Sequence, residues 1–430
     1  MIDIKYIREN PDEAIERFKM KERDTSEEIA EILELDKKRR SIIALNDQLR
    51  AEQNRTSKLV PQYKKEGKNT DEIFAEMKKL SAQIKENDAE LEKIEARYKE
   101  LMLGLPNLPD RDLKPGGKEN NEPLRYFGEP QKFDFEPKNH VDICTELGLV
   151  DYKRGVKLSG NGFWVYRGLG AKLEWALLNY FIETHLSNGY ELVLVPHMLG
   201  YECGLTAGQF PKFAGEVYWI NTDEDERRMF MLPTAETALV SLHRDEILAE
   251  SDLPLKYISY TPCFRREAGS YGAEERGMVR GHQFNKVEMV QYTTPEKSDE
   301  AFEELVTHAE NLVRGLGFHF RTVKLAAGDC SASMARTYDI EIHIPSMNGY
   351  KEVSSVSNAR DYQARRGNIR FRRAEGGSIE YVHTLNGSGL ATSRILPAIV
   401  EQNQQKDGSV VVPEVLRKYV GTDVIRKTEI

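Results

Sequence analysis

The sequence predicts an α+β protein in which a long helical hairpin precedes a domain built on a largely antiparallel sheet. Two observations lead to this fold class. Residues 26 to 103 are highly charged, contain a single glycine and carry an apolar heptad pattern. After residue 189, short apolar runs have the pattern of strands, with helical stretches around them. A chain of 430 residues is expected to form two or three domains, and its 40% hydrophobic content is enough for a sizeable core.

The helical hairpin is predicted from apolar residues spaced alternately by four and three positions. The pattern of the second helix comprises Ile73, Met77, Leu80, Ile84, Asn87, Leu91, Ile94, Tyr98 and Leu101. The first helix has a weaker pattern, formed by Ile32, Leu35, Arg39, Ile42, Asn46, Leu49, Gln53, Thr56, Val60 and Tyr63. Pro61 is expected to bend or end this helix near its tip. The run from Gly67 to Asp71 predicts the turn between the helices.

A hairpin of two helices, each about 35 residues and roughly 50 Å long, must project from a domain of this size. Coiled coils commonly serve dimerisation or spacing, and the alternative is an arm that reaches a large partner. Acidic residues are frequent in the hairpin too, so charge alone does not decide between these interpretations. The basic residues that are candidates for contact with a phosphate backbone are Lys37, Lys38, Arg39, Arg40, Lys58, Lys64, Lys65 and Lys68.

The remaining elements follow from prolines, glycines and periodicity. Residues 104–137 predict a linker, because six prolines and four glycines exclude long helices. An amphipathic helix is expected over Ala171–Leu186, followed by a buried strand over Tyr190–His197 that ends at Pro196. A helix is expected over Asp299–Val313. The later strands are expected at Met289–Tyr292, Tyr338–Ile344 and Gly349–Ser354.

Composition excludes several classes of protein. The net charge of -9 argues against nucleic-acid binding through bulk charge, so any such contact needs a local basic patch. The N-terminus lacks the apolar core of a signal peptide, and no run of about 18 apolar residues predicts a membrane span. A cytoplasmic location is therefore expected. Neither a zinc site nor a disulfide framework is predicted, because the four cysteines are scattered: Cys144, Cys203, Cys263 and Cys330.

The segment from Thr261 to Glu288 gives the strongest indication of function. Two apolar-aromatic runs flank a charged, glycine-rich middle, which predicts two strands joined by a long loop. Guanidinium groups bind phosphate oxygens in pairs, and an aromatic ring stacks on a base. The segment therefore suits a nucleoside triphosphate better than a sugar or a lipid, and the alternative is a surface hairpin with solvated arginines. Its charged and aromatic residues are Phe264, Arg265, Arg266, Glu267, Arg276, Arg280, His282, Phe284 and Glu288.

Three segments, taken in order, resemble the motifs of class II aminoacyl-tRNA synthetases. Gly189–Pro196 resembles motif 1, Phe264–Glu288 motif 2 and Gly387–Arg394 motif 3. Within this class, eight shorter segments are similar to the seryl-tRNA synthetase family. They are MLPTAE ending at Glu236, LHRDEIL at Leu242, CFRREAGS at Cys263, HQFNKVE at His282, YDIEIHIP at Tyr338, EVSSVSN at Glu352, QARR at Gln363 and HTLNGSGLA at His383.

The resemblance covers essentially the whole chain and implies its domain organisation. Residues 1–103 would form an N-terminal tRNA-binding domain, with the helical arm at about 26–103. The linker 104–137 would lead to a class II catalytic domain at 138–430. A homodimer is also implied, because motif 1 normally forms the subunit interface in this class.

The implied activity is that of a serine–tRNA ligase. Serine and ATP would form seryl-adenylate and pyrophosphate by in-line attack of the serine carboxylate on the α-phosphorus. The seryl group would then pass to tRNA(Ser), and also to tRNA(Sec). This chemistry depends on positioning and charge neutralisation. The alternatives are a paralogue that loads a small amino acid onto a carrier other than tRNA, and a non-catalytic coiled-coil scaffold.

The resemblance also assigns residues to the two catalytic substrates. Arg265 and Arg394 would be the catalytic arginines: Arg265 on the α-phosphate and the serine carboxylate, Arg394 on the adenine or near the γ-phosphate. Glu267 would meet the adenine amino group, and Phe284 would stack on the adenine ring. The full ATP site would comprise Arg265, Arg266, Glu267, Arg280, Gly281, Phe284, Glu352, Val353, Ser354, Ser355 and Arg394.

The serine pocket and the metal site are implied in the same way. Glu352 and Ser355 resemble a pair that coordinates a divalent ion on ATP, and their hard oxygen atoms suit Mg²⁺. Taken alone, Glu352 is equally well an exposed strand carboxylate, and Thr234 and Ser388 fit caps or turns. The serine pocket would comprise Thr234, Ala235, Glu236, Arg265, Glu288 and Ser388.

Overall fold

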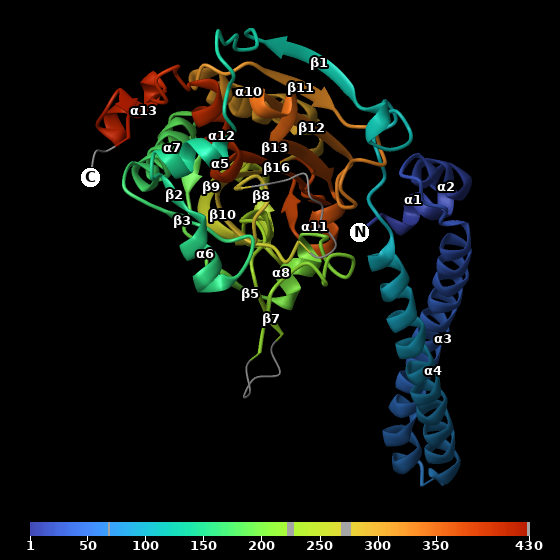
Figure 1. Ribbon diagram of the computed structural model, residues 1–430. Helices are drawn as coiled ribbons and strands as arrows, with labels where there is room; N and C mark the ends of the chain where they lie inside the picture. The colour runs from blue at the N-terminus through green and yellow to red at the C-terminus, as the bar shows by residue number, and fades with distance from the viewer. Residues whose placement is uncertain (68, 222–227, 268–276, 428–430) are drawn as a thin grey trace. The chain divides into compact units, whose positions relative to one another are not determined.

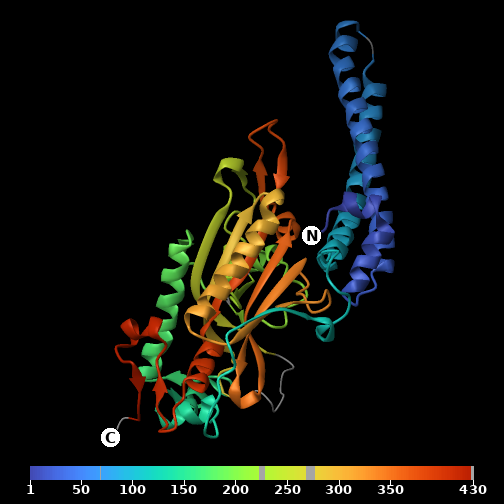
Figure 2. The ribbon, with the colours of Figure 1, turned by 90° about the horizontal axis from the view of Figure 1, so that it is seen from above.

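The computed structural model describes residues 1–67, 69–221, 228–267 and 277–427 (Figures 1 and 2). The chain divides into two compact units. The first comprises Ile2–Lys19 and Arg23–Leu105, and the second comprises Met1, Met20–Glu22 and Pro106–Ile430.

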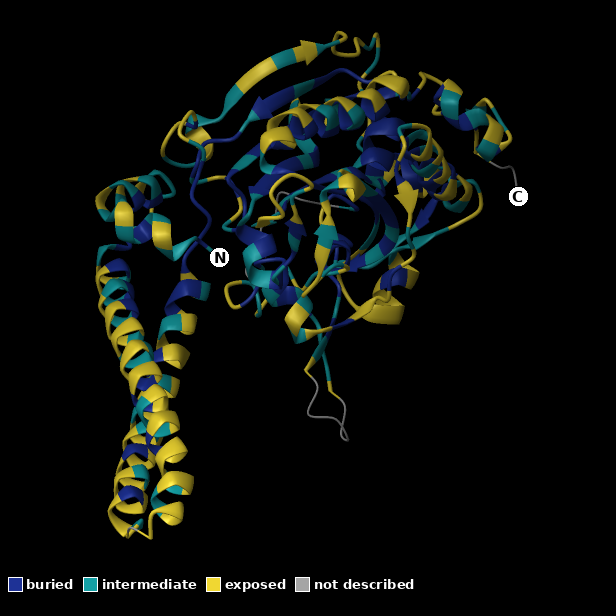
Figure 3. Cartoon of the chain, turned by 180° about the vertical axis from the view of Figure 1, so that it is seen from behind, coloured by how far each residue is buried: buried dark blue, intermediate teal, exposed yellow. Residues whose placement is uncertain are grey.

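The first unit is helical, and its two long helices form the predicted hairpin. Figure 3 shows the buried residues of this hairpin on the facing sides of its helices and exposed residues on the outer sides. From Ile73 to Leu101, every predicted seam position is buried or half-buried and every position between them is exposed. The coiled-coil arm is thereby confirmed. The helices are α1 (Ile4–Glu9), α2 (Pro11–Met20), α3 (Ser26–Lys65) and α4 (Asp71–Gly104).

Two polar seam residues pair with each other inside the hairpin. Asn87 Nδ2 donates to Asn46 Oδ1 at 2.8 Å, and Asn46 is only 2% exposed. Such a pair fixes the register of the helices at some cost in stability. Helix α3 continues through Pro61 and ends four residues later at Lys65, so of the two expected effects Pro61 does not end the helix, and the bend stays a prediction. A proline removes one backbone hydrogen bond, and the helix resumes its bonding beyond it with Glu66 N–H to Gln62 O at 3.0 Å.

The second unit is built on an eight-stranded sheet with the order β1-β11-β12-β13-β16-β10-β9-β4. All neighbours in it are antiparallel except β4 and β9, which confirms the predicted fold class. The strands are β1 (Glu122–Phe127), β4 (Glu191–Leu192), β9 (Leu255–Phe264), β10 (Gln283–Thr293), β11 (Phe320–Lys324), β12 (Arg336–Ile344), β13 (Gly349–Arg360) and β16 (His383–Ala391).

Four small sheets surround the large one. In two of them, β2 (Val150–Asp151) pairs with β3 (Val165–Tyr166), and β17 (Val410–Val411) pairs with β18 (Val424–Ile425). In a third, β7 (Met229–Met231) lies between β5 (Met198–Gly200) and β6 (Trp219–Ile220). In the fourth, β14 (Arg370–Arg372) lies between β15 (Ile379–Tyr381) and β8 (Ile247–Ala249). The helices are α5 (His140–Glu146), α6 (Tyr152–Ser159), α7 (Leu169–Ser187), α8 (Tyr201–Thr206), α9 (Glu236–Leu239), α10 (Ser298–Gly315), α11 (Tyr362–Gly367), α12 (Thr392–Gln402) and α13 (Glu414–Val420). Short 3₁₀ turns occupy Lys118–Asn120, Glu250–Asp252, Pro295–Lys297 and Pro345–Met347.

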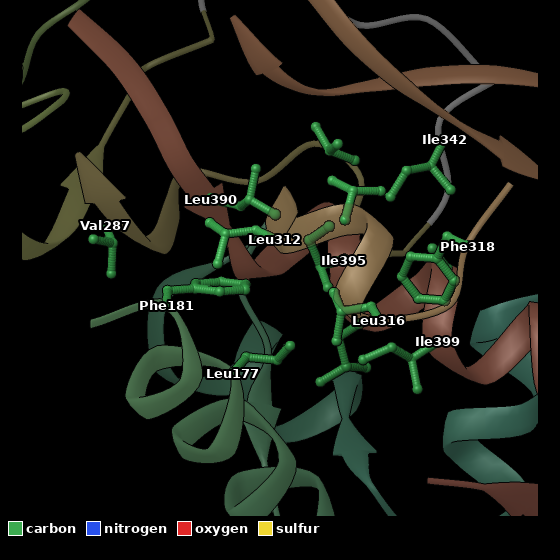
Figure 4. Packing of buried hydrophobic residues seen from close by; sticks show 14 of the residues in the cluster. Leu177, Phe181, Val287, Leu312, Leu316, Phe318, Ile342, Leu390, Ile395 and Ile399 are labelled. Carbon is green, nitrogen blue, oxygen red and sulfur yellow. The ribbon is translucent and has the colours of Figure 1, made fainter. Parts of the chain in front are cut away.

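The main core lies between one face of the large sheet and helices α7, α10 and α12. Figure 4 shows Phe181 of α7, Leu312 of α10 and Ile395 of α12 gathered near Leu390 of β16, and Val287 of β10 belongs to the same cluster. In β10, Val287 and Met289 belong to this core, whereas Phe284 packs against a different cluster. Since side chains alternate along a strand, Glu288 and its alternate neighbours face the opposite side of the sheet.

The expected elements of the second unit can be compared with the structure. The helices predicted over Ala171–Leu186 and Asp299–Val313 are confirmed as α7 and α10, and the three later strands are confirmed within β10, β12 and β13. From Pro106 onward, the segment predicted as a linker lies in the second unit, where it contributes β1 at the sheet edge. No described helix combines the length and the apolar character that a membrane crossing requires.

The prediction of a buried strand over Tyr190–His197 is wrong. Only Glu191–Leu192 pairs, as the edge strand β4. Leu194 is 76% exposed and Leu192 37%. The apolar run predicts burial, but an edge strand of two residues has a single neighbour in the sheet to cover it.

Candidate active site

Two cavities adjoin on the face of the large sheet opposite α7, α10 and α12. The smaller cavity, of about 210 Å³, is lined by Arg265, Glu267, Val279, Arg280, Gly281, Phe284, Lys286, Glu352, Val353, Ser388, Ala391, Ser393 and Arg394. The larger cavity, of about 440 Å³, is lined by Gln209, Phe213, Glu216, Val217, Pro233, Thr234, Glu236, Arg265, Glu267, Lys286, Glu288, Ser331, Ser333, Met334, Glu352, Ser355, Ser357, Asn386 and Ser388. Side chains common to both linings make the cavities continuous, and these are Arg265, Glu267, Lys286, Glu352 and Ser388.

The hairpin of β9 and β10 brings the residues of the Thr261–Glu288 segment together. Phe264 pairs with Gln283, which confirms the two predicted strands. The alternation of β10 directs Phe284, Lys286 and Glu288 to one face, where all three line a cavity. Residues 268–276, with Gly269, Gly272 and Arg276 among them, lie outside the described part of the chain.

A flat ring and three guanidinium groups surround the smaller cavity. The Arg265 guanidinium carbon lies 5.1 Å from the centroid of the Phe284 ring. Arg280 Nε is 2.7 Å from Glu267 Oε2. The third group belongs to Arg394, in the first turn of α12. This arrangement offers an aromatic face and several cationic hydrogen-bond donors to one ligand.

Arg394 is held against strand β13. Its Nη1 donates to the backbone oxygen of Glu352 at 2.8 Å and lies 3.1 Å from the Glu352 carboxylate. Desolvation raises the pKa of Glu352, but the Arg394 guanidinium, together with Arg265 and the Ser355 hydroxyl, more than offsets it and holds the pKa below its usual value. Glu352 therefore remains an ionised carboxylate at neutral pH, and its oxygen atoms can accept hydrogen bonds or bind a cation.

Gly281 gives the smaller cavity its wall on the side of Trp164. A Cβ atom at position 281 would lie 2.2 Å from the Trp164 ring, which is closer than any side chain allows. Glycine therefore lets the returning chain pack directly on the indole.

A buried ion pair forms one wall of the larger cavity. The Lys286 ammonium pairs with the Glu288 carboxylate, and the two side chains are 7% and 1% exposed. Lys286 Nζ also donates to Thr234 Oγ1 at 2.8 Å, and Asn386 Nδ2 donates to Glu288 Oε1 at 3.3 Å. This wall therefore presents hydroxyl, carboxylate and ammonium groups in fixed positions.

A second carboxylate, Glu236, lies in the same cavity. Gln363 Nε2 donates to Glu236 Oε1 at 2.9 Å. Burial and the neighbouring Glu288 carboxylate raise the pKa of Glu236 to about 7, although the Lys286 ammonium acts in the opposite direction. A cation that enters the cavity would favour the ionised form of Glu236.

The structure brings most of the predicted site residues together and leaves three outside both cavities. Arg266 donates to the Gly215 carbonyl at 3.1 Å, and Ser354 donates to the Ser388 carbonyl at 2.7 Å. Ala235 is 1% exposed and packs in the core. The predicted residues that line a cavity are Thr234, Glu236, Arg265, Glu267, Arg280, Gly281, Phe284, Glu288, Glu352, Val353, Ser355, Ser388 and Arg394.

Sequence reasoning missed Lys286, Gln363 and the loop that carries Ser331 and Ser333. Lys286 lies midway between Phe284 and Glu288, so strand alternation alone places it on the same face. Gln363 belongs to the QARR segment. Nothing in the sequence distinguishes the two serines from ordinary loop residues.

The oxygen-rich end of the larger cavity bears on metal binding. No group of three His, Cys, Asp or Glu side chains that could hold a metal occurs among the described residues. Ser355 Oγ, however, lies in the lining with Glu352, and it donates to Asp339 Oδ1 at 2.6 Å. Burial, and then the Glu352 carboxylate, raises the pKa of Asp339 well above its ordinary value, so Asp339 favours its protonated form here.

Comparisons with known proteins identify the family of this chain. Residues 1–109 match the family model for the seryl-tRNA synthetase N-terminal domain, and residues 218–403 match that for the tRNA synthetase class II core domain (G, H, P, S and T). The chain is 59% identical to serine–tRNA ligase 2 of Clostridium acetobutylicum, across 98% of this chain and all of the relative. It is 51% identical to the serine–tRNA ligase of Thermotoga maritima, across 99% of this chain and all of the relative.

Two solved structures are similar over the whole chain. The seryl-tRNA synthetase from Pyrococcus horikoshii complexed with ATP has a TM-score of 0.92 and 33% sequence identity, and the alignment covers 100% of both chains. The cytoplasmic serine–tRNA ligase from Naegleria fowleri in complex with AMP has a TM-score of 0.87 and 28% identity, covering 100% of this chain and 99% of that one.

Proposed function

Since the chain belongs to the seryl-tRNA synthetase family and is a class II serine–tRNA ligase that uses ATP, we propose that its smaller cavity holds ATP and its larger cavity holds serine. One observation carries this assignment. Arg265 lines both cavities, so a single guanidinium can reach the α-phosphate of one substrate and the carboxylate of the other.

In the smaller cavity, Phe284 stacks on adenine and the arginines neutralise the triphosphate. The position of Arg265 over the Phe284 ring supports this assignment, because it places a phosphate-binding fork beside the base. Arg394 binds the far end of the triphosphate or the second face of the base. Glu267 accepts from the adenine amino group, and Arg280 orients its carboxylate.

In the larger cavity, charge balance supports a zwitterionic ligand. Glu236 and Glu288 carry two negative charges against the single ammonium of Lys286, which leaves a place for the substrate ammonium. Arg265 faces the substrate carboxylate. A pocket that hydrogen-bonds the serine hydroxyl leaves buried polar groups unpaired when alanine enters, so it discriminates strongly against alanine.

The first step is attack of the serine carboxylate on the α-phosphorus, with pyrophosphate as the leaving group. Arg265 aligns the attacking oxygen with the α-phosphate and offsets the negative charge that both bring together. Arg394 offsets the charge of the leaving pyrophosphate. These contributions are positioning and electrostatic stabilisation by groups already fixed in place.

Glu352 and Ser355 would hold Mg²⁺ that enters with ATP. A carboxylate and a hydroxyl supply two hard oxygen ligands, and Mg²⁺ commonly uses one or two carboxylates together with substrate phosphates and water. When bound, Mg²⁺ would neutralise phosphate charge.

The helical arm is the proposed contact for tRNA(Ser). The match of residues 1–109 to the N-terminal domain of this family supports that role. Domain limits of 1–103 for the tRNA-binding part and 138–430 for the catalytic part, and charging of tRNA(Sec), stay predictions.

A homodimer is proposed from the surface of the motif 1 region. Large apolar side chains are exposed on α7 and around β4, as expected where a second copy covers them. These are Trp175, Leu186, Leu192, Leu194 and Met198. All four cysteines are free, which suits a cytoplasmic location.

Serine-dependent exchange of labelled pyrophosphate into ATP tests the assignment of substrates. We expect exchange with L-serine in the presence of Mg²⁺, and little exchange with alanine, threonine or cysteine. Transfer to tRNA(Ser) in a second assay separates the ligase from a paralogue that loads another carrier. Absence of serine-dependent exchange by a folded preparation would overturn the proposal.

A further inference from the structure

Helix α7 carries two buried polar side chains that the proposed chemistry does not use. Glu174 is 4% exposed and His185 is fully buried. They are eleven residues apart, which at about 100° per residue brings them back to nearly the same face of the helix. That face is turned toward motif 3, residues 387–394.

Glu174 joins motif 2 to motif 3. Its Oε1 atom accepts from Asn285 Nδ2 at 2.8 Å and from Thr392 Oγ1 at 2.5 Å. Asn285 lies between Phe284 and Lys286 of β10, with its side chain on the opposite face of the strand. Thr392 is the first residue of α12, two positions before Arg394.

His185 contacts the same corner one strand position after Ser388. Its Nε2 atom is 3.1 Å from the Gly389 carbonyl oxygen, and because a carbonyl only accepts, Nε2 must be the donor. The ring packs so tightly that a Cβ on residue 389 would lie 2.3 Å from Nε2. Burial lowers the pKa of His185 to about 4, so the ring is neutral and carries a single N–H.

We propose that Glu174 and His185 are positioning residues for the corner between β16 and α12. Through their hydrogen bonds they fix Arg394, which follows this corner, relative to Phe284 across the smaller cavity. Apolar side chains at these two positions would bury the helix equally well. Apolar contacts have no preferred direction, however, so they would restrict rotation and sliding of the corner less than the hydrogen bonds do. The Glu174 carboxylate also lies at the first turn of α12, where the helix dipole favours negative charge.

The inference rests on the proposed assignment of the smaller cavity to ATP, and it is tested with the full chain. The variant is Glu174→Gln, which keeps the shape and removes the charge. The matched control is Glu310→Gln on α10, because Glu310 is also 4% exposed and its Oε1 accepts from Thr322 Oγ1 at 2.6 Å and Arg125 Nε at 2.7 Å. Glu310 lines neither cavity.

We expect Glu174→Gln to weaken ATP binding roughly 5- to 10-fold, as the weakening of a buried hydrogen-bonded contact would. The Kd for ATP is measured by calorimetry, and the KM for serine should change less than about twofold. Glu310→Gln should lower the melting temperature about as much as Glu174→Gln does, and it should leave the ATP Kd and the serine KM unchanged. His185→Leu should act like Glu174→Gln, whereas His185→Gln, which retains a donor, should restore part of the affinity.

A double-mutant cycle with Arg394→Ala decides whether Glu174 acts through Arg394. If it does, Glu174→Gln costs little further ATP affinity once Arg394 is absent. An equal loss in both backgrounds, or equal damage to the ATP and serine constants, would refute the positioning role. Should Glu174→Gln fail to fold, Thr392→Ala removes the same hydrogen bond from the other side, and an unchanged ATP Kd in that variant would also refute it.

Failure of the inference differs from failure of the proposed function. If the wild-type protein shows no serine-dependent exchange, the assignment of the cavities is wrong. If the wild type is active but ATP affinity is unaffected in the variants, only the role of Glu174 and His185 is lost.

Discussion

Replacing Glu288 by alanine removes one partner of the buried ion pair in the larger cavity. The Lys286 side chain is only 7% exposed, so its ammonium would be left in a poorly hydrated wall with Thr234 Oγ1 as its remaining hydrogen-bond acceptor at 2.8 Å. Breaking a buried pair from one side typically costs about 3–5 kcal/mol. At about 1.4 kcal/mol per tenfold change, the lower limit corresponds to a loss of roughly 100-fold in serine affinity if the cost falls on binding.

The assay is pyrophosphate exchange, with serine and ATP varied in turn. We expect kcat/KM for serine to fall at least about 100-fold, because Glu288 is in the proposed serine wall and its loss leaves the Lys286 ammonium without its paired carboxylate. The KM for ATP should change less than about threefold. A serine KM equal to that of the wild type would refute the reasoning.

Loss of folding must be separated from loss of binding. The double variant Lys286→Met with Glu288→Gln removes both charges and keeps similar volumes. Since replacing both members of a buried pair is often neutral for folding, the double variant should regain most of the stability that Glu288→Ala loses, measured by urea unfolding. It should not regain serine activation. Recovery of both would show that the pair serves folding alone.

Three further predictions follow from the arm, from Glu236 and from Glu352. Deletion of residues 30–100 should leave serine-dependent exchange within about twofold and abolish tRNA(Ser) charging, and unchanged charging would contradict the role of the arm. Because the pKa of Glu236 is raised to about 7, its carboxyl is mostly protonated at pH 6 and ionised at pH 8, so serine should bind roughly tenfold more tightly at pH 8 and Glu236→Gln should flatten this dependence in calorimetry. By the same shift, the unliganded protein gains stability from Glu236 below about pH 4.5 and loses it as the pH rises to about 7. Chelation of Mg²⁺ should stop exchange, and Glu352→Ala should raise the Mg²⁺ concentration needed for half-maximal rate, which exchange assays over a magnesium series would measure.

The sequence predicts those parts of the fold whose signal is local. The heptad seam of the arm, helix α7 and the hairpin of β9 and β10 each follow from periodicity, and each is present. The strand prediction for residues 190–197 was wrong because an apolar run indicates burial but does not say which part of the protein, or which other chain, covers it. Leu194 is exposed for this reason.

The same limit applies to the site. Motif resemblance found most of the residues that line the cavities along β10, β13 and α12, because their side chains are fixed by strand and helix periodicity. It could not reveal that Gln363, from α11, holds Glu236, or that Glu174 bonds Thr392 across 218 positions of sequence. Contacts of this kind depend on how the elements pack against one another, and local sequence patterns do not predict that packing. Ser354 belongs to a matching segment, yet its hydroxyl bonds the Ser388 carbonyl within the sheet.

In the proposed assignment, the Arg265 guanidinium, which lines both cavities, links the binding of the two substrates thermodynamically. If ATP in one cavity draws this charge toward its phosphate, the carboxylate in the other meets a different electric field, and its dissociation constant changes by some factor. Reciprocity requires serine to alter the dissociation constant of ATP by that same factor. The order in which the two substrates enter would then reflect their rates of access. The coupling free energy that Arg265 provides between them is the same whichever substrate binds first.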